Sequence, residues 1–273
     1  MISVVDWNSR HQSAYCCCLG DHDECLRSGA RLKRYWIQKM SLNGLECKIA
    51  IDEYKQPIGM IEYVPMRVAP AEGDGYYFIN CIHVIGPKHP RGTFRNRGVG
   101  KALLKVCEDD AVEHGAKGVA AWGWIRAPGM KASWFEKQGY KFADRKGHKE
   151  LLRKKFARDA ERPRWIAKKP SPMLDPDIFT ITAYISGQCP IMNYRFSQLR
   201  KISAEFGGLI QFNCKPTMTK ESMLQYGTND AIFVGKKLLN DCTVQSDNSV
   251  RIMLKKALKN FYSPSFLRKY LKL

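Results

Sequence analysis

Two kinds of apolar pattern alternate along the chain and predict a mixed α/β protein. Short apolar runs rich in β-branched and aromatic residues, bounded by turn residues, are typical of strands. Longer runs in which apolar residues recur every three or four positions are typical of amphipathic helices. In the first half, the predicted strands are 46–54, 59–67, 76–84 and 117–124, and the predicted helices are 6–18, 24–42 and 101–114.

A second series of elements follows a proline-rich stretch, residues 163–176, where four prolines stand close together. Such stretches are typical of domain boundaries. Beyond it, the predicted strands are 178–185, 209–214, 231–234 and 236–240, and the predicted helices are 193–206, 219–226 and 249–261. We therefore expect a first domain at 1–160, a basic, proline-rich linker at 161–176 and a smaller α/β domain at 177–273.

A basic glycine-containing loop joins the predicted strand 76–84 to the predicted helix 101–114. Its sequence is Arg95-Asn96-Arg97-Gly98-Val99-Gly100-Lys101-Ala102. A helix that begins after such a turn offers unpaired backbone N–H groups and the positive end of its dipole to an anion. Glycine lets a ligand approach the backbone closely. This loop therefore predicts a phosphate-binding site.

The order of these segments resembles the acetyl-CoA region of GNAT N-acetyltransferases. The resemblance rests on the strand 76–84, the Arg-x-x-Gly-x-Gly loop, the helix after it, the strand KGVAAWGW and the segment ASWFEKQGY at 132–140. It implies a GNAT fold with a mixed, mostly antiparallel sheet that closes with two more strands, near 140–144 and 149–156. It also implies acetyl-CoA as co-substrate and an amine, on a small molecule or a peptide, as acceptor.

The resemblance further implies how acetyl-CoA would bind. The strand 76–84 would splay from its neighbour so that the thioester enters between them. Backbone groups of Ile82, Val84 and Ile85 would hold the pantetheine arm. The pyrophosphate would be held by Arg95, Asn96, Arg97, Gly98, Val99, Gly100, Lys101 and Ala102. Direct attack by the amine would need no metal.

The sequence offers three candidates for the residue that would take the proton from the amine. Glu62, His83 and Cys81 lie on predicted strands beside the expected cleft and are candidates for the general base, although a Glu or His on a strand is more often structural. Many GNAT proteins carry a tyrosine four residues before the glycine of the late helix, where it can protonate the leaving thiolate. Phe135 occupies that position here and has no proton to give.

The ten cysteines are scattered, which does not fit the disulfide framework of a small secreted domain. Cys16, Cys17, Cys18 and Cys25 stand near Asp21 and His22, and such residues could hold a soft metal. Because no pair of Cys-x-x-Cys motifs is present, we favour buried or incidental thiols, with a substrate-lining thiol as an intermediate reading. By resemblance, this N-terminal segment would shape the acceptor site.

The second domain follows the order β-α-β-α-β-β-α and resembles the thioredoxin-like fold. A GNAT domain followed by it is similar to GNAT proteins with a YoaP-like C-terminal domain. Cys189 would stand at the start of the first helix, where a thiol can be acidified. Met192 replaces the second cysteine of a Cys-x-x-Cys motif, so a dithiol reductase is not expected. We favour a degenerate domain that makes contacts or shapes the substrate site.

The chain is strongly basic, with a formal net charge of +19 and a pI near 9.5. The excess rises from +6 up to Glu150 to +13 beyond it. The densest run, 145–169, contains no nucleic-acid motif, so we interpret it as a solvated connector and do not expect nucleic-acid binding. The basic loop 85–94 is interpreted as a surface insertion, with contact to the ligand's phosphates as the alternative.

The chain has no apolar stretch of membrane-spanning length and no signal-peptide pattern, so a cytoplasmic protein is expected. The leading functional hypothesis is an acetyl-CoA-dependent N-acyltransferase, and a homodimer is left open. The alternative is a CoA-binding or thiol-sensing protein that uses Cys189, with a catalytically degenerate GNAT domain.

Overall fold

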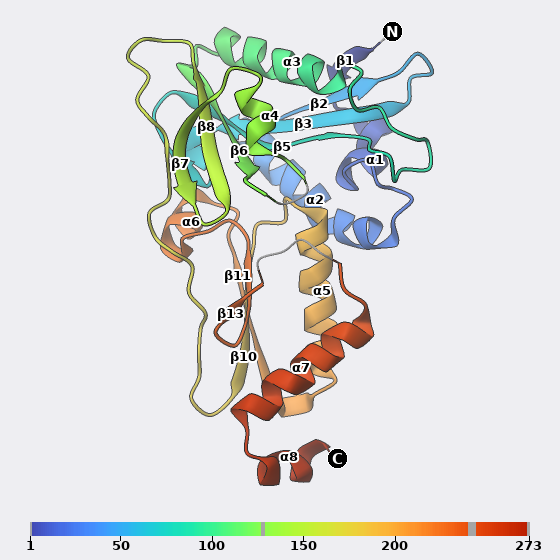
Figure 1. Cartoon of the computed structure of the whole chain (residues 1–273), viewed down its shortest axis with the longest axis vertical. Coiled ribbons are helices and arrows are strands. Elements are labelled where there is room, and N and C mark those ends of the chain that lie inside the picture. Colours follow the sequence, from blue (N-terminus) through green and yellow to red (C-terminus); the bar gives the residue numbers. More distant parts are fainter. Residues whose placement is uncertain (1, 127–128, 240–243, 272–273) are drawn as a thin grey trace.

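The structure, a computed structural model, describes residues 2–126, 129–239 and 244–271. It contains two α/β units that follow one another along the long axis of the molecule, with the N-terminus at one end and the C-terminal helix at the other (Figure 1). Each unit has a sheet and an apolar core of its own. The class expected from the sequence, α/β with a mixed sheet, is therefore confirmed.

The first unit is built on a seven-stranded sheet. Only its central pair, β5 and β6, is parallel, and every other neighbouring pair is antiparallel. The strand order is β1 (Ser3–Asp6), β2 (Glu46–Ile51), β3 (Pro57–Pro65), β5 (Tyr76–Val84), β6 (Gly118–Trp124), β8 (Lys149–Lys155) and β7 (Lys141–Lys146). The mixed, mostly antiparallel sheet is thus confirmed, including the two closing strands.

Helices cover both faces of this sheet. On one face, α1 (Gln12–Cys16) and α2 (Glu24–Ser41) bury an aromatic and aliphatic stripe that includes Trp36, Ile37 and Met40. On the other face, α3 (Val99–Glu113) and α4 (Ala132–Glu136) pack through residues such as Leu103 and Phe135. The two cores fix the sheet between the helices, and the central strands β3 and β5 contact both of them.

The N-terminal segment differs from the expected helix at 6–18. Residues Ser3–Asp6 instead form the edge strand β1, which pairs antiparallel with β2. Helical structure is limited to a 3₁₀ turn, Ser9–His11, and to α1. An edge strand can pair its backbone with β2 while its polar side chains face water. Val4 and Val5 are half-buried in this conformation, so no helix is needed to shield them. In the segment 132–140, which resembles the late helix of GNAT proteins and its Gly-Tyr end, the helix spans only Ala132–Glu136.

The segment between the units is not the solvated connector that we expected. Its strand β9 (Arg164–Trp165) pairs with the short β4 (Ala71–Glu72), just after the 3₁₀ turn Met66–Val68. Ile166 is buried. The Lys146 ammonium donates to the carbonyl oxygens of Ile166 and Lys168, each at 3.0 Å. The basic composition of this run predicts a solvated segment. The contacts with the first unit are made instead by its backbone carbonyls and by Ile166, which the charge pattern does not reveal.

The second unit contains a four-stranded sheet in the order β11 (Ile210–Pro216), β10 (Phe179–Ile185), β12 (Ala231–Val234) and β13 (Lys237–Leu238). β10 is parallel to β11 and antiparallel to β12. The helices are α5 (Pro190–Ala204), α6 (Lys220–Tyr226), α7 (Asp247–Phe261) and α8 (Pro264–Leu271), with a 3₁₀ turn at Gly207–Leu209. The expected element order is confirmed and α8 is added, while the likeness to thioredoxin stays a prediction.

The two units are in direct contact at α2 and α5. The side-chain amide of Asn193 donates to the carbonyl oxygen of Gly29 at 3.1 Å. A second contact lies at α6, where the Lys220 ammonium donates to the carbonyl oxygen of Ala69 at 2.9 Å. The backbone of one unit is therefore hydrogen-bonded by side chains of the other, which fixes how the units face each other.

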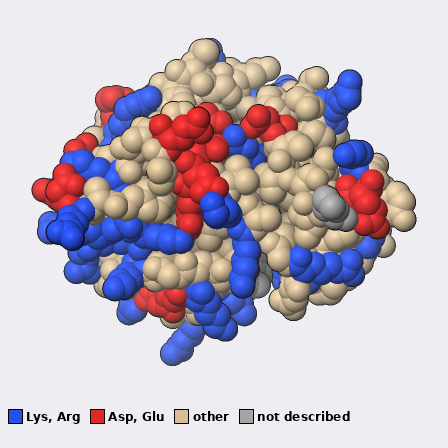
Figure 2. All heavy atoms as spheres, turned by 90° about the horizontal axis from the view of Figure 1, so that it is seen from above, with Lys and Arg blue, Asp and Glu red and all other residues tan. Residues whose placement is uncertain are grey.

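The surface at the end that carries α3 bears both signs of charge. Figure 2 shows acidic side chains near the middle of this face, with basic side chains on either side of them. The net positive charge of the chain is therefore not spread as one continuous basic surface over this end. Within the described residues, no helix is both long and apolar enough to span a bilayer.

Candidate functional site

The two parallel strands at the centre of the first sheet separate halfway along their length. Pairing between β5 and β6 runs from Tyr76 with Gly118 to Ile79 with Ala121, and then stops, although β5 continues to Val84 and β6 to Trp124. Backbone groups beyond Ile79 on the β6 side of β5 are thus left without a strand partner. This opening is the splay expected at strand 76–84.

A bulge in β5 marks the point where the strands part. Glu62 of β3 pairs with Cys81, whereas its neighbour Tyr63 pairs with Ile79, so Asn80 is the extra residue. The carbonyl oxygen of Asn80 accepts a hydrogen bond from the Trp122 indole at 3.0 Å. A bulge of this kind bends a strand and redirects its backbone groups, and bulges are frequent beside active sites.

The amide of Ile82 points into the opening. Its partner is the thioether sulfur of Met130, at 3.5 Å. A thioether is a weak acceptor, so a carbonyl oxygen that entered the opening would be a better partner for this N–H. The geometry supplies one backbone donor at the place where the resemblance brings in the thioester, and a donor there can polarise a thioester carbonyl.

The basic loop leads directly into α3, as expected. Gly98 is the N-cap residue, with φ +84, and the first amide with an intrahelical partner is Ala102, which donates to the Gly98 carbonyl at 3.0 Å. Glycine has no side chain to cap the helix, so the amides of the first turn are left for an outside acceptor. No atom lies within 4 Å of the position that a Gly98 Cβ would take, so the approach is open.

The predicted cofactor residues fall into two groups. The exposed ones are Arg95, Asn96, Arg97, Gly98 and Lys101, and those wholly or partly buried are Val99, Gly100, Ala102, Ile82 and Val84. Gly100 is close to both neighbouring elements, because a Cβ there would lie 3.1 Å from the Trp134 ring and 3.8 Å from Val84. The loop and the end of β5 therefore adjoin, so one extended ligand could contact both.

Ile85 does not fit the predicted set. Its N–H donates to the Ile58 carbonyl at 3.1 Å, and its own carbonyl accepts from the Phe94 N–H at 3.0 Å. Its side chain is buried. Because both backbone groups already bond within the protein, Ile85 anchors the loop 85–94 and is a poor partner for a pantetheine arm.

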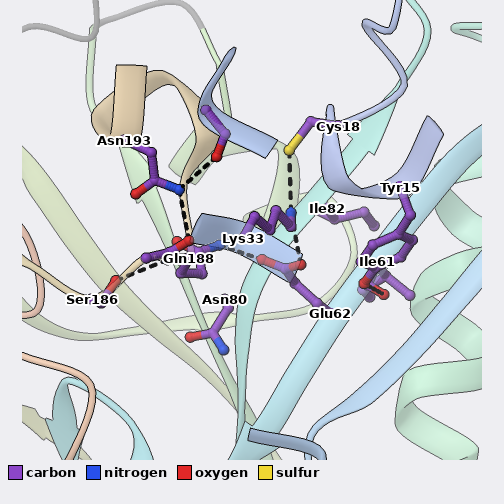
Figure 3. A network of polar contacts seen from close by, with 12 residues as sticks. Tyr15, Cys18, Lys33, Ile61, Glu62, Asn80, Ile82, Ser186, Gln188 and Asn193 are labelled. Carbon is purple, nitrogen blue, oxygen red and sulfur yellow. Dashed lines mark hydrogen bonds and ion pairs between the residues drawn. The ribbon is translucent and has the colours of Figure 1, made fainter. Parts of the chain in front are cut away.

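On the α2 side of the sheet, Glu62 is held in a buried ion pair. Figure 3 shows its carboxylate facing Lys33 of α2, with Nζ 3.0 Å from Oε2, and both side chains are 0% exposed. The Gln188 amide of the second unit donates to Oε1. A carboxylate that is already paired with a cation and an amide is not free to take a proton from a substrate. The structure therefore argues against Glu62 as the general base.

The other two base candidates are also poorly matched to neutral pH. Burial, with the charges of Arg95 and Lys33, lowers the pKa of His83 to about 4. A hydrogen bond to Cys18 and burial raise the pKa of Cys81 well above its ordinary value. A general base works best with a pKa near the operating pH. At neutral pH His83 is therefore too weak a base, and the Cys81 thiol is too little ionised.

Phe135 is buried in the core below α4, with its ring in edge contact with Trp134 and Tyr140. It acts as a packing residue in this position. The Tyr140 hydroxyl is itself buried, and burial raises the pKa of this phenol well above its ordinary value. Neither Phe135 nor Tyr140 is therefore suited to donate a proton to a leaving thiolate.

A small crevice with apolar and polar walls lies where the second unit meets the first. Its lining residues are Trp36, Met40, Val68, Pro70, Asn80, Ser186, Gln188, Met223 and Asn229. Ser186 is fixed by Asp230, whose carboxylate accepts from the Ser186 N–H at 2.9 Å and from its hydroxyl at 2.8 Å. Burial raises the pKa of Asp230 to about 6. The loop after β10 thus reaches the bulge of β5 with a rigid polar end.

The thiols singled out in the sequence are distributed over several surroundings. Cys189 is the N-cap residue of α5 and is half-buried. Cys16 and Cys17 are buried, Cys18 and Cys25 half-buried. Within the described part of the chain, the one group whose ligand atoms come within 4.8 Å of one another is Asp21, His22 and His89, so these cysteines do not form a metal cluster with His22.

Sequence reasoning missed two residues of this site, Lys33 and Gln188. A signal for the first was present: Lys33 lies between Ala30 and Ile37 on the stripe that α2 buries. A lysine at a core position needs a buried partner. No local pattern points to Gln188, because its partner Glu62 is far away in the sequence.

Comparison with known proteins agrees with this geometry. Residues 10–140 match the family model described as "Acetyltransferase (GNAT) family". The match supports a GNAT acetyltransferase domain over this segment, and the mixed sheet is consistent with the fold of that family. The search of curated proteins found no match.

Solved structures similar to the chain include several GNAT proteins. The PaiA N-acetyltransferase of Thermoplasma acidophilum, in complex with coenzyme A, is 16% identical, with 57% of this chain and 99% of that chain covered and a TM-score of 0.44. YhbS of Escherichia coli, in complex with CoA, is 14% identical, with 60% and 89% covered and a TM-score of 0.44. A Brucella melitensis acetyltransferase with acetyl-CoA is 13% identical, with 59% and 92% covered and a TM-score of 0.40.

Proposed function

We propose that the first unit transfers an acyl group, most simply acetyl, from acyl-CoA to an amine. The observation that carries this proposal is the opening between β5 and β6, which meets the uncapped start of α3 at Val84 and Gly100. The pyrophosphate would lie against the exposed residues of the loop Arg95–Lys101, and the thioester would enter beside the Ile82 amide. The family match over residues 10–140 supports the same reading.

The reaction would be a direct attack. The amine nitrogen adds to the thioester carbonyl, the carbonyl oxygen gains charge beside the Ile82 N–H, and the CoA thiolate leaves. Proximity and stabilisation of the developing oxyanion would supply most of the acceleration. Since Glu62, His83 and Cys81 are each unsuited to take the proton at pH 7, the amine would lose it to water or to a group of the acceptor itself.

We also propose that the second unit, residues 177–273, is a thioredoxin-like module that shapes the acceptor side. Its strand order and helix positions support the likeness. Ser186 and Gln188 reach the same crevice as Asn80 and Trp36 of the first unit. An acceptor amine that approached the bulge of β5 from this side would contact both units.

Binding of acetyl-CoA is tested by calorimetric titration of the full chain and of two leucine variants. Gly98→Leu places a side chain where the pyrophosphate would lie. Gly115→Leu is the matched control, because Gly115 follows the other end of α3, also has a positive φ (+71) and also has no atom within 4 Å of a Cβ. Both variants carry similar backbone strain, roughly 1–2 kcal/mol.

We expect saturable binding by the wild-type chain and by Gly115→Leu, and loss of binding by Gly98→Leu. Equal binding by both variants would refute the assignment of the loop. Once binding is established, release of the CoA thiol in the presence of a panel of primary amines would test transfer. Absence of amine-dependent release across such a panel would leave a CoA-binding domain and remove the transferase from the proposal.

A further inference from the structure

The buried pair Lys33 and Glu62 has a third partner, the thiol of Cys18. The Lys33 ammonium lies 3.3 Å from the Cys18 sulfur as well as 3.0 Å from the Glu62 carboxylate (Figure 3). Cys81 of β5 is opposite Glu62 in the sheet register and lies within hydrogen-bonding reach of Cys18. Two thiols from segments 63 residues apart in the sequence therefore meet beside a buried ammonium.

The backbone at Cys18 is held in an unusual conformation. Cys18 and Leu19 have φ values of +49 and +63, and neither is glycine. Consecutive left-handed residues cost roughly 1–2 kcal/mol each, so the surrounding structure must impose them. The buried Leu19 side chain anchors the turn, and the Leu19 N–H donates to the Ala14 carbonyl at 2.7 Å. This turn directs the Cys18 sulfur towards Lys33.

The surroundings of Cys18 favour its thiolate, unlike those of four other thiols of the first unit. The hydrogen bond from Cys81 and the Lys33 ammonium lower the pKa of Cys18 to about 7. Burial instead raises the pKa of the thiols of Cys16, Cys17, Cys47 and Cys107. The thiolate is the nucleophilic form of cysteine, so Cys18 is more reactive at neutral pH than these four thiols.

We propose that Cys18 and Cys81 form a reactive thiol pair that a small hydroperoxide oxidises to a disulfide. The Cys18 thiolate attacks one peroxide oxygen, the O–O bond breaks, and the departing hydroxide takes a proton to become water. This leaves a sulfenic acid on Cys18. Once the Cys18 thiolate is consumed, Cys81 loses the neighbour that most raises its pKa. Its sulfur then attacks the Cys18 sulfur while its proton passes to the sulfenic oxygen, the S–O bond breaks, and a second water leaves. Two thiols and one hydrogen peroxide thus give one disulfide and two waters.

The size and polarity of the site suit this oxidant. Cys18 and Cys81 are both half-buried, so a molecule as small as hydrogen peroxide reaches them more easily than a bulky disulfide does. The neighbouring ammonium stabilises both the attacking thiolate and the departing hydroxide. The disulfide would join the turn after α1 to the bulged part of β5. This chemistry stands on the thiol pair alone and does not depend on acyl transfer.

The test is peptide mapping of the full chain after brief treatment with hydrogen peroxide. Free thiols are blocked with N-ethylmaleimide, and the digest is analysed without reduction. We expect a Cys18–Cys81 linked peptide, lost after reduction, as the main oxidation product. A link from Cys18 to Cys16, Cys17 or Cys47, or oxidation confined to the exposed Cys214, would overturn the proposal.

Three variants separate chemistry from folding. Cys81→Ser removes the resolving thiol, so a sulfenic acid should persist on Cys18 and be trapped there by dimedone. Cys18→Ser should yield neither the link nor the trapped adduct. Cys214→Ser is the matched control, since it removes an exposed thiol of the second unit and should leave the link unchanged. Failure of Cys81→Ser to give a Cys18 adduct, with its circular dichroism unchanged, would also contradict the proposal.

Discussion

The ammonium of Lys33 lies 3.0 Å from the carboxylate of Glu62, and both side chains are completely buried between α2 and the centre of the sheet. Taking two charges out of water costs about as much as their attraction returns, so the pair adds little net stability. The individual charges nevertheless depend on each other strongly. The same ammonium also lies 3.3 Å from the sulfur of Cys18, in the left-handed turn after α1.

The first prediction concerns this dependence. Lys33→Met leaves the Glu62 carboxylate buried without its cation and should destabilise the protein by about 3–5 kcal/mol. The double variant Lys33→Met/Glu62→Gln removes both charges and keeps an acceptor for the Gln188 amide, so most of this loss should be recovered. Urea unfolding of the single and double variants measures the difference. If the double variant is no more stable than Lys33→Met, the two charges are not coupled.

The second prediction concerns the reactivity of Cys18 with pH. With a pKa of about 7, roughly half of this thiol is ionised at neutral pH, so alkylation by iodoacetamide should reach half its maximal rate near pH 7. Cys81→Ala removes the hydrogen bond that lowers this pKa most, and its midpoint should move to higher pH. Rates are read from the modified Cys18 peptide by mass spectrometry. A midpoint above pH 8.5 in the wild-type chain would contradict the assignment.

The third prediction concerns stability in acid. His83 has a folded-state pKa of about 4 against 6.5 for a free histidine, so the unfolded chain binds a proton at a higher pH than the folded chain does. The free energy of unfolding should therefore fall as the pH drops from 6.5 to 4, by on the order of 2–3 kcal/mol from this group. His83→Gln should flatten the profile in that window. The exposed His148→Gln is the control and should leave the slope unchanged.

The fourth prediction concerns the contact between the units. Gln188→Glu places a second carboxylate against Glu62, so two acids would compete for the single ammonium of Lys33. We expect a loss of about 2–4 kcal/mol, larger than that of Gln188→Leu, which only removes a donor. Gln211→Glu adds the same charge at an exposed position of β11 and should be nearly neutral. Thermal unfolding at equal ionic strength compares the three variants, and equal losses at 188 and 211 would rule out the specific repulsion.

The sequence predicted the parts of the fold that local patterns determine. The strand at 76–84 was found with its bounds, because an apolar β-branched run between polar turns is unambiguous. The glycine loop predicted the start of α3 for a similar reason. In α2, however, apolar residues stand at both 35 and 36, and the structure buries Trp36 while Tyr35 is half exposed. A shift of one residue in the phase of the helix determines which of the two is buried, and the apolar pattern at 35–37 fits either phase.

The catalytic candidates could not be judged from the sequence because their character depends on distant partners. From its strand position, Glu62 is a plausible general base. Only the structure shows that its carboxylate already bonds to Lys33 and Gln188. Cys18 reads as one of three adjacent cysteines. Its difference from Cys16 and Cys17 comes from a left-handed turn and from Cys81, which is 63 residues away. Contacts of this kind arise from packing and leave no short-range pattern.

The close approach of α2 and α5 limits how the two halves can vary. A Cβ on Gly29 would lie 2.0 Å from the carbonyl oxygen of Pro190, so any side chain there would push the second unit off the first. The Asn193 amide bonds to the same residue, and Gln188 bonds to Glu62 nearby. A different domain fused to the first unit would need the same contact residues, those at 188–193, in order to pack in this way. The two halves are therefore expected to be inherited together, with substitutions at these positions matched across the join.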